Sequence, residues 1–337
     1  MTQLVLEALW SPEALSGRAL ALSLAVLLDH LFGDPRSSLH PVAWLGRFIG
    51  QAERAIRRLC GSAETAGGIL LVAVTVPVAA GPALGLSVGL FHLYPPVAIA
   101  VEAVLVWLTL ASRSLAHEGR EVSTLLGETD LPAARARVAR LVARRTESLS
   151  ESEIARAAIE SLGENVVDAV IAPLFWAALL GAPGAWLHKA VSTLDSMTGY
   201  RSERYRRFGT ASARLDDVLV WLPARLALLA VPLAAIRAGF SGRRSWAVGL
   251  RDRRKHASPN SAHGEALFSG ALGVRLGGPV EYGEGIHDRA LIGAEFPVPK
   301  GADIARAAEL VTMTAALTAI GLAGTLLVTT MLLGWSP

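Results

Sequence analysis

Glu160, Glu164 and Asp168 are carboxylates that follow one another at steps of four residues. On an α-helix a step of four turns a side chain by only about 40° and raises it about 6 Å, so all three project from one face. Asp168 lies inside an apolar run, where a carboxylate is costly unless a cation accompanies it. Because Mg²⁺ takes a few carboxylates together with substrate phosphates and water, the pattern predicts a magnesium site. The alternative is a solvated helix face that ends at a membrane.

A second group of polar side chains follows in the segment LHKAVSTLDSMTGYR. Asp195 is a candidate second metal ligand or general base, although Asp also suits an ordinary helix N-cap. Lys189 and Arg201 are candidates for binding phosphate, Lys as a point charge and Arg as a planar fork. Asp216 and Asp217 are neighbours and point to different faces of a helix, so we expect one to face a site and the other the solvent.

The segment RDRRKHASPNSAHGE combines basic side chains with a turn. Ser258, Asn260 and Ser261 can offer hydroxyl and backbone N–H groups to an anion beside Arg254 and Lys255. The segment therefore predicts a phosphate site, unless it is a capped loop with a basic flank. Because the chain has no Walker A, GxGxxG or nucleophile-elbow motif, any nucleotide site must be of another kind.

Some charged residues lie within or beside apolar runs, where they are expected to be functional or paired. Glu102 is either a functional carboxylate or a protonated hydrogen-bonding group in a helix interface. Arg225 is expected to pair with one of the two adjacent aspartates that precede it. His30, Asp34 and His40 form a small polar cluster that gives a weak zinc signal, and a structural role is favoured.

The elements that must position these residues are those of a membrane protein. Of the 337 residues, 52% are hydrophobic and only 18% are charged, whereas roughly a quarter of a soluble domain is charged. This composition predicts an all-α, polytopic integral membrane protein. The net charge of +3 gives little reason to expect a nucleic-acid partner, and the single cysteine, Cys60, excludes an internal disulfide and a cysteine-based metal site.

The apolar runs predict one membrane-embedded domain over residues 1–337, with about four full spans and two interrupted helices. The expected segments are a weak span at 14–33, a hairpin of spans at 67–91 and 97–111, cytoplasmic helices at 112–165, broken or re-entrant helices at 166–187 and 218–238, a cytoplasmic loop region at 239–309 and a final span at 311–335. Two helix starts are marked by Leu131 with Pro132 and by Ser150 with Glu153.

The basic residues predict which segments face the cytoplasm. All but two of the 32 Lys and Arg residues fall in the segments 34–66, 112–165, 188–217 and 237–309. The positive-inside rule places these segments in the cytoplasm, and a full crossing by 166–187 would put one of them outside. We therefore expect a multi-pass protein of the cell (inner) membrane whose active site faces the cytoplasm. The rival topology has six full spans.

Four stretches of the chain resemble the CobD/CbiB family, the adenosylcobinamide-phosphate synthases of cobalamin biosynthesis. They are DHLFGDPRSSLHPVAWLG, ESLGENVVDAVIAPLFW, GAPGAWLHKAVSTLDSMTGYRSERYRRFGTASARLDDVLVWLPARL and SPNSAHGEALFSGALGVRLGGPVEYG. They run in order from Asp29 to about Gly285, and several are long and unusual, so the match is specific. Ser192 stands where the family pattern usually has Asn, and Leu219 with Val220 replaces a segment that often carries Asn.

The resemblance implies a ligase that uses ATP and Mg²⁺ to join adenosylcobyric acid to aminopropanol, or its phosphate, through an amide bond. Transfer of the γ-phosphoryl group of ATP to the carboxylate gives an acyl phosphate, which the amine then attacks. Positioning and charge neutralisation dominate such a step. The implied partners are these substrates, the lipid bilayer, and a second copy of the chain or later membrane-bound cobalamin enzymes.

On this hypothesis the candidate residues take three roles. The Mg²⁺ ligands are Glu160, Glu164, Asp168 and Asp195. The phosphate-binding residues are Arg201, Arg207, Arg254, Lys255, Ser258, Asn260 and Ser261. The catalytic residues are Lys189, which neutralises phosphate, and Asp216 or Asp217, which takes the proton of the attacking ammonium. A membrane transporter, or a non-catalytic sensor related to the regulators of β-lactamase induction, is the alternative, because a shared fold does not guarantee catalysis.

Overall fold

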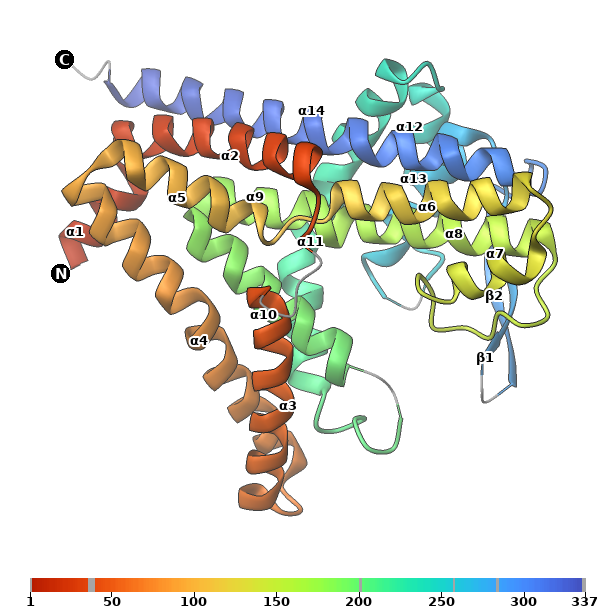
Figure 1. Ribbon diagram of the computed structural model, residues 1–337, viewed down its shortest axis with the longest axis horizontal. Coiled ribbons are helices and arrows are strands. Elements are labelled where there is room, and N and C mark those ends of the chain that lie inside the picture. The colour runs from red at the N-terminus through yellow and green to blue at the C-terminus, as the bar shows by residue number, and fades with distance from the viewer. Residues whose placement is uncertain (1, 36–39, 200–201, 257, 283–284, 335–337) are drawn as a thin grey trace. The chain divides into compact units, whose positions relative to one another are not determined.

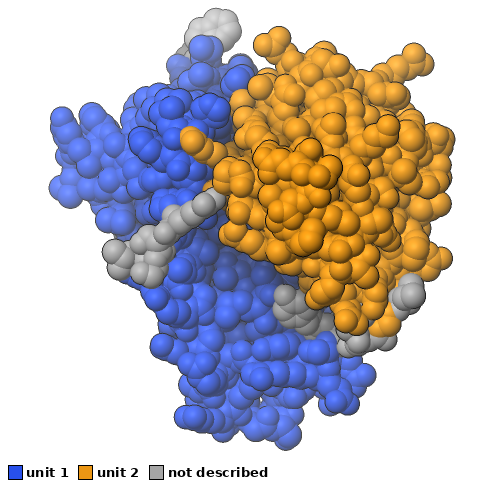
Figure 2. Space-filling view, turned by 45° about the vertical axis from the view of Figure 1, so that its right-hand side comes forward, with its two compact units in different colours: residues 1–110, 172–219, 319–337 blue, residues 111–171, 220–318 orange. Residues whose placement is uncertain are grey.

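The computed structural model describes residues 2–35, 40–199, 202–256, 258–282 and 285–334, which are mostly helical (Figure 1). The chain divides into two compact units, each assembled from separate stretches of sequence (Figure 2). Unit 1 comprises Met1–Leu110, Ala172–Leu219 and Ala319–Pro337, and unit 2 comprises Ala111–Ile171 and Val220–Thr318. The expectation of one membrane-embedded domain stays a prediction, because compactness does not show whether either unit folds alone.

Unit 1 is built around α10 (Ala182–Thr198). Its other helices are α1 (Thr2–Trp10), α2 (Pro12–Phe32), α3 (Pro41–Cys60), α4 (Glu64–Leu93), α5 (Pro95–Trp107), α9 (Ala172–Leu180), the first part of α11 (Thr210–Arg237) and the last part of α14 (Gly301–Gly334). Helix α10 packs against α3, α4, α5 and α9. Ala190 and Leu194 of α10 are buried in a core with Ile49 of α3, Leu71 of α4 and Phe208.

Unit 2 is built around two helices that cross at glycines. Its elements are α6 (Ser112–Gly127), α7 (Leu131–Val138), α8 (Glu151–Val166), η1 (Val167–Ile171), the rest of α11, α12 (Gly242–Asp252), α13 (Ser261–Leu272), β1 (Leu276–Tyr282), β2 (Gly285–Ile292) and the first part of α14. A Cβ on Gly264 of α13 would overlap the carbonyl oxygen of Gly163 of α8. Gly264 must therefore be glycine for the helices to approach this closely, and a Cβ on Gly163 would lie only 3.1 Å from the backbone of Glu265.

The two helix starts marked in the sequence are confirmed. Helix α7 begins at Leu131, and the side chain of Asp130 accepts a hydrogen bond from the amide of Ala133 at 3.0 Å. Helix α8 begins after Ser150, where a capping box forms with Glu153. The expected interruption within 166–187 is also present, because α9 ends at Leu180 and α10 begins at Ala182.

The prediction of an all-α, polytopic membrane protein is confirmed. Six described helical segments are long and apolar enough to cross a membrane: Pro12–Phe32, Glu64–Leu93, Pro95–Gly127, Glu151–Leu180, Thr210–Arg237 and Gly301–Gly334. The number exceeds the expected four full spans. By length and composition, the rival topology with six spans is therefore available to the chain.

Helix α11 is not broken within 218–238, because it continues through Pro223 and Pro232, and a re-entrant course for this segment stays a prediction. Proline lacks the N–H that would bond the carbonyl four residues earlier, which for Pro223 is that of Leu219. In the structure the indole Nε1 of Trp176 donates to this oxygen at 3.0 Å. A donor from another helix replaces the missing backbone bond, and the helix does not need to end.

The expected loop region at 239–309 contains more regular structure than its turn residues suggested. It holds α12, α13 and an antiparallel hairpin in which Gly278 pairs with Arg289 and Pro279 with Asp288. A shift of register, as at a β-bulge, lies between Leu276 and Gly278. The hairpin positions Arg289 against α8 and α13, as described below.

Candidate functional site

Unit 1 brings three carboxylates close together: Asp195 from α10, and Asp216 and Asp217 from α11. We call them the carboxylate trio. Asp195 interacts electrostatically with Asp217, and Asp216 interacts with both. Burial, and then the negative charge of Asp217, raise the pKa of Asp195 to about 6. Asp216 and Asp217 are both half-buried, so burial does not single out one of them as the residue that faces the solvent.

The trio has the chemistry of a cation site. The Oδ1 atom of Asp216 is buried and has no hydrogen-bond partner among the described residues. Like-charged carboxylates near one another repel, and a cation that joins them relieves this repulsion. Carboxylate oxygens are also the protein ligands that Mg²⁺ prefers, usually one or two of them with substrate phosphates and water. The three side chains are not placed to hold a metal ion as a group of three. Two of them, together with phosphate oxygens and water, would suit a divalent cation, and the trio would also suit the ammonium group of an amine.

Lys189 lies near the polar pair of Asp34 and His40 in unit 1. The Nε2 atom of His40 is 3.1 Å from Asp34 Oδ1, and its Nδ1 accepts a hydrogen bond from the amide of Val42 at 3.2 Å. His40 therefore caps α3 while it holds Asp34. Burial lowers the pKa of His40, the charge of Asp34 raises it, and the positive charge of Lys189 lowers it further. The favoured structural role of His40 agrees with this geometry.

The four predicted magnesium ligands are not assembled as one group. Within the described ranges, no three or more His, Cys, Asp or Glu side chains are placed to hold a metal ion. Glu160, Glu164 and Asp168 belong to unit 2, whereas Asp195 belongs to unit 1. Asp168 lies in the π-helical turn η1, where the α-helical spacing assumed from the sequence does not apply. Such turns are frequent at functional sites, and no residue pattern announced this one.

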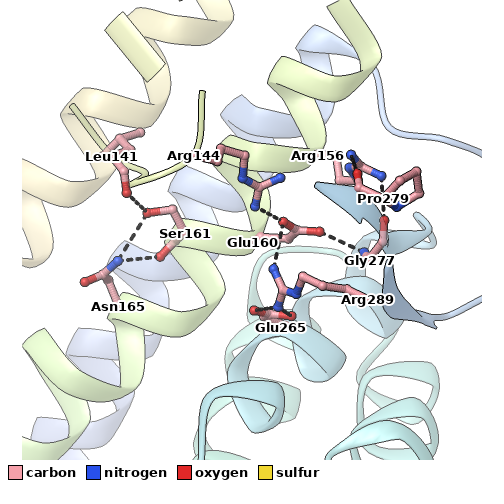
Figure 3. Close-up of polar contacts among 10 residues, drawn as sticks. All are labelled: Leu141, Arg144, Arg156, Glu160, Ser161, Asn165, Glu265, Gly277, Pro279 and Arg289. Atoms are coloured by element: carbon pink, nitrogen blue, oxygen red, sulfur yellow. Dashed lines mark hydrogen bonds and ion pairs between the residues drawn. The ribbon is translucent and has the colours of Figure 1, made fainter. Parts of the chain in front are cut away.

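Glu160 is instead the centre of an ion network (Figure 3). Its Oε2 accepts a hydrogen bond from Arg144 and lies 3.3 Å from Arg289 Nη1, and its Oε1 accepts one from the amide of Gly277 at 2.7 Å. Glu160 and Arg144 are both buried. Both oxygens of Glu160 are therefore occupied by the protein itself, which is the arrangement of a structural carboxylate.

Arg289 links Glu160 to a second buried acid, Glu265 (Figure 3). Nη2 of Arg289 donates to both oxygens of Glu265, at 2.7 and 3.0 Å. Arg156 fixes the same hairpin by donating to the carbonyls of Gly277 and Pro279 at 2.6 and 2.8 Å. No sequence pattern indicated this network, because Glu160 meets Gly277 and Arg289 across more than 100 residues and only the fold brings them together.

The predicted phosphate-binding residues have different surroundings. Lys255 is engaged, because its Nζ lies 2.9 Å from Asp252 Oδ1 and donates to the carbonyl of Leu291 at 2.9 Å. Arg254 and Arg207 are exposed. Arg201 lies outside the described residues.

The turn before α13 is held by its own polar groups. Ser258 Oγ accepts a hydrogen bond from the amide of Asn260 at 3.3 Å, and Ser261 begins α13. Asn260 Oδ1 accepts one from Arg225 Nη1 at 2.9 Å. Arg225 also donates to the carbonyl of Trp221 and lies over its ring, 4.3 Å from the centroid. Within the described residues Arg225 makes no ion pair, so the expectation that it pairs with an adjacent aspartate is wrong.

Comparison with known proteins places these residues in a family. A family model described as CobD/Cbib protein matches residues 22–311. The chain is 49% identical to cobalamin biosynthesis protein CobD of Geobacter metallireducens over 77% of the chain and 81% of that protein. It is 45% identical to cobalamin biosynthesis protein CobD of Pelobacter propionicus, over 81% of the chain and 84% of that protein. It is 44% identical to cobalamin biosynthesis protein CbiB of Salmonella typhimurium, over 78% and 83%.

No solved protein structure matches the chain. The family model covers well over half of its length, and each of these relatives is matched over most of its own length. The residues matched by the family model include the stretches that carry the carboxylate trio, the Glu160 network and the turn before α13. The chain therefore belongs to the CobD/CbiB family.

Proposed function

We propose that this protein is a ligase of cobalamin biosynthesis that joins adenosylcobyric acid to aminopropanol, or to aminopropanol phosphate, through an amide bond. Membership of the family and the names of the relatives support the pathway. The observation that carries the reaction type is the carboxylate trio, which gathers Asp195, Asp216 and Asp217 within one unit.

The reaction must first make a carboxylate into an acyl donor. The γ-phosphoryl group of ATP moves to the substrate carboxylate, which gives an acyl phosphate and ADP. The amine nitrogen then forms the C–N bond, the C–O bond to phosphate breaks, and inorganic phosphate leaves with one proton lost from the amine. Because little covalent chemistry falls to the protein, binding and charge neutralisation are its main tasks.

The carboxylate trio supplies groups for both steps. Asp195 and the unpartnered Oδ1 of Asp216 would hold Mg²⁺, which when bound neutralises charge on the triphosphate. Asp217 would take the proton that the attacking ammonium loses. Lys189, near the Asp34–His40 pair, would place its positive charge against a phosphate. We thus propose Asp195 as the first metal ligand.

Glu164 and Asp168 remain proposed ligands or polar contacts of unit 2. Glu160 is proposed as a scaffold residue, because its oxygens already bind two arginines and an amide. The substitutions Glu164→Gln and Asp168→Asn, each in protein purified in normal yield, test whether these two residues have a binding role. A loss of product formation beyond threefold supports a binding role. A smaller change means a loss of transition-state stabilisation under about 0.7 kcal/mol and removes these residues from the metal site.

The topology proposed from the basic residues completes the scheme. The protein would be a multi-pass protein of the cell (inner) membrane with its active site towards the cytoplasm, where ATP and the corrinoid acid are available. A second copy of the chain, or a later membrane-bound enzyme of the pathway, would be its partner there. Labelling of a single cysteine introduced at Lys189, in a Cys60→Ser background, from the cytoplasmic but not the outer side is expected.

The decisive experiment measures ATP consumption by the purified protein with and without each organic substrate. The proposal expects consumption that depends on both the corrinoid acid and the amine. Asp217→Asn and Asp216→Asn should each lower it at least 100-fold, whereas the control Glu13→Gln, at an exposed acid of the same unit, should not. Consumption without the corrinoid acid, or binding of the amine with no turnover, would point instead to a transporter or a sensor.

A further inference from the structure

Three arginines surround the start of α13 in unit 2, and none of them makes an ion pair among the described residues. Arg225 reaches Asn260, the N-cap of α13, as described above. Arg253 and Arg254 follow α12 directly. Their neighbours differ, because Arg251 and Lys255 both bind Asp252 at 2.9 Å. The acid in this segment is therefore used by the flanking bases and leaves Arg253 and Arg254 to another partner.

His263, in the first turn of α13, is a second indication of a binding site near these arginines. Its side chain is only 1% exposed. Its Nδ1 lies 3.2 Å from the carbonyl oxygen of Asn260, which can only accept, so Nδ1 carries the proton. Nε2 is buried and has no hydrogen-bond partner in the described part of the chain. A buried ring nitrogen without a partner is costly, and such an atom marks a place where a ligand can bind.

The arginines and the histidine share one electrostatic environment. Burial, together with the positive charges of Arg225, Arg253 and Arg254, lowers the pKa of His263 to about 4, against the hydrogen bond to Asn260 that raises it. The N-terminus of α13 adds its own positive potential. Clustered positive charges without acids repel one another, and an anion among them would relieve this repulsion.

We propose that Arg225, Arg253, Arg254, His263 and the N-terminus of α13 form a binding site for a phosphoryl group. The planar forks of arginine and the N–H groups of a helix start are the donors that phosphate oxygens take in proteins. This composition differs from the one expected from the sequence. Lys255 is excluded by its ion pair with Asp252, and Arg225, Arg253 and His263 are added.

His263 gives the site a distinctive property. With the proton on Nδ1, the free Nε2 can accept a hydrogen bond from a protonated phosphoryl oxygen, or it can take up a proton and donate to an ionised one. Either way, a bound phosphoryl group favours the protonated ring through its negative charge. Binding should therefore raise the pKa of His263, and a purely structural histidine would not respond.

Two ligands of the proposed reaction carry this chemistry, ATP and aminopropanol phosphate. To this extent the inference rests on the proposed function, although the site itself is defined by its charges. Binding is best measured on the full-length protein in bilayer discs of neutral lipid, without divalent cation, so that the carboxylate trio contributes little. ATP and aminopropanol phosphate are titrated separately, with no corrinoid acid present.

The test variant is Arg253→Gln with Arg254→Gln, and the matched control is Arg237→Gln with Arg243→Gln. The control removes the same charge from exposed arginines of the same unit. The site predicts that Kd for at least one ligand rises tenfold or more in the test variant and less than twofold in the control. The ligand that responds is the occupant. An unchanged Kd for both ligands, or an equal loss in the control, would overturn the site.

A second readout follows the ring of His263 by NMR of histidine-labelled protein, with its signal assigned by loss in His263→Gln. Saturating ligand should raise the pKa of this ring by more than one unit, and an unchanged titration contradicts the proposal. Turnover separates the two hypotheses. If the ligand binds at this site but no amide forms, the site is supported and the proposed reaction is contradicted. If the double variant forms the amide at full rate and with unchanged KM, the reaction is supported and the site is contradicted.

Discussion

Arg289 donates through Nη2 to both carboxylate oxygens of Glu265, at 2.7 and 3.0 Å. This contact joins strand β2 to helix α13, and Nη1 of the same arginine reaches Glu160 of α8. Arg289 therefore contacts two buried acids from two helices at once. The close crossing of α8 and α13 at Gly163 and Gly264 makes this possible.

Replacement of Arg289 by Ala should destabilise the protein by about 3–5 kcal/mol, because it leaves the buried Glu265 without its cation and removes one of the two cations of Glu160. Unfolding by denaturant in a fixed detergent measures the loss. The control is Arg145→Ala, which breaks an ion pair with Glu281 between half-exposed side chains and should cost less than about 1 kcal/mol. Equal losses in the two variants would show that the network is not a buried electrostatic unit.

Local signals in the sequence were sufficient for the helices but not for the network. Ser150 with Glu153 predicted the start of α8 correctly, because a capping box involves only neighbouring residues. Glu160 was expected to bind metal, and its actual partners are Arg144, Gly277 and Arg289. Pairings over such separations depend on tertiary structure, which periodicity does not contain.

The carboxylate trio could be predicted only in part. Asp195, Asp216 and Asp217 were each singled out as candidates, but their proximity depends on how α10 packs near the start of α11. Adjacent positions on a helix point to different faces, and yet Asp216 and Asp217 are equally half-buried. Two residues about 100° apart on a helix can both face the same neighbour when that neighbour lies between their directions.

The pKa of Asp195, raised to about 6, predicts how cation binding depends on pH. Below pH 6 the carboxylic acid is protonated and cannot bind a cation, so affinity for Mg²⁺ should fall about tenfold per pH unit there and level off above it. Asp217→Asn removes one cause of the raised pKa, so the midpoint of the pH dependence of Mg²⁺ affinity should move to lower pH. Because burial is the larger cause, this midpoint should stay above the ordinary pKa range of aspartate.

Isothermal titration calorimetry with Mg²⁺ at a series of pH values measures this pH dependence of affinity. The control is Glu13→Gln, which should leave the midpoint where it is. A midpoint near 4 in the unmodified protein, or no movement in Asp217→Asn, would show that the trio does not bind the ion through Asp195.

Arg18 is buried in unit 1 and closes the end of α9. Its Nη1 donates to the carbonyls of Ala178 and Leu179, both at 3.2 Å, and its Nε lies 3.7 Å from Glu102 Oε1. Glu102 in turn accepts a hydrogen bond from the amide of Ala182 at 3.2 Å. Glu102 therefore lies in a helix interface, which was one of its two expected roles.

Arg18→Met should destabilise the protein by about 3–5 kcal/mol, because it leaves the carbonyls of Ala178 and Leu179 without a donor and Glu102 without its cation. Arg18→Met combined with Glu102→Gln should recover part of the loss, since the buried charge is removed while the carbonyls stay unpaired. Thermal unfolding of the two variants in one detergent makes the comparison. If the double variant is less stable than the single one, Glu102 does not depend on Arg18.

Trp176 and Pro223 allow a test of how α11 stays helical although Pro223 leaves the carbonyl of Leu219 without a backbone donor. Trp176→Phe removes the donor to Leu219 O and should cost about 1 kcal/mol, because a buried carbonyl is left unsatisfied. In a Pro223→Ala background the new backbone N–H reaches the same carbonyl, so Trp176→Phe should cost only a few tenths of a kcal/mol there. The difference is a coupling energy of at least about 0.5 kcal/mol, measured by a double-mutant cycle of denaturant unfolding.

Trp186→Phe in the same two backgrounds is the control, because its indole bonds the carbonyl of Leu105 and should show no coupling to Pro223. Coupling equal to that of the control would mean that the indole of Trp176 does not substitute for the missing amide and that the freed carbonyl is satisfied in another way.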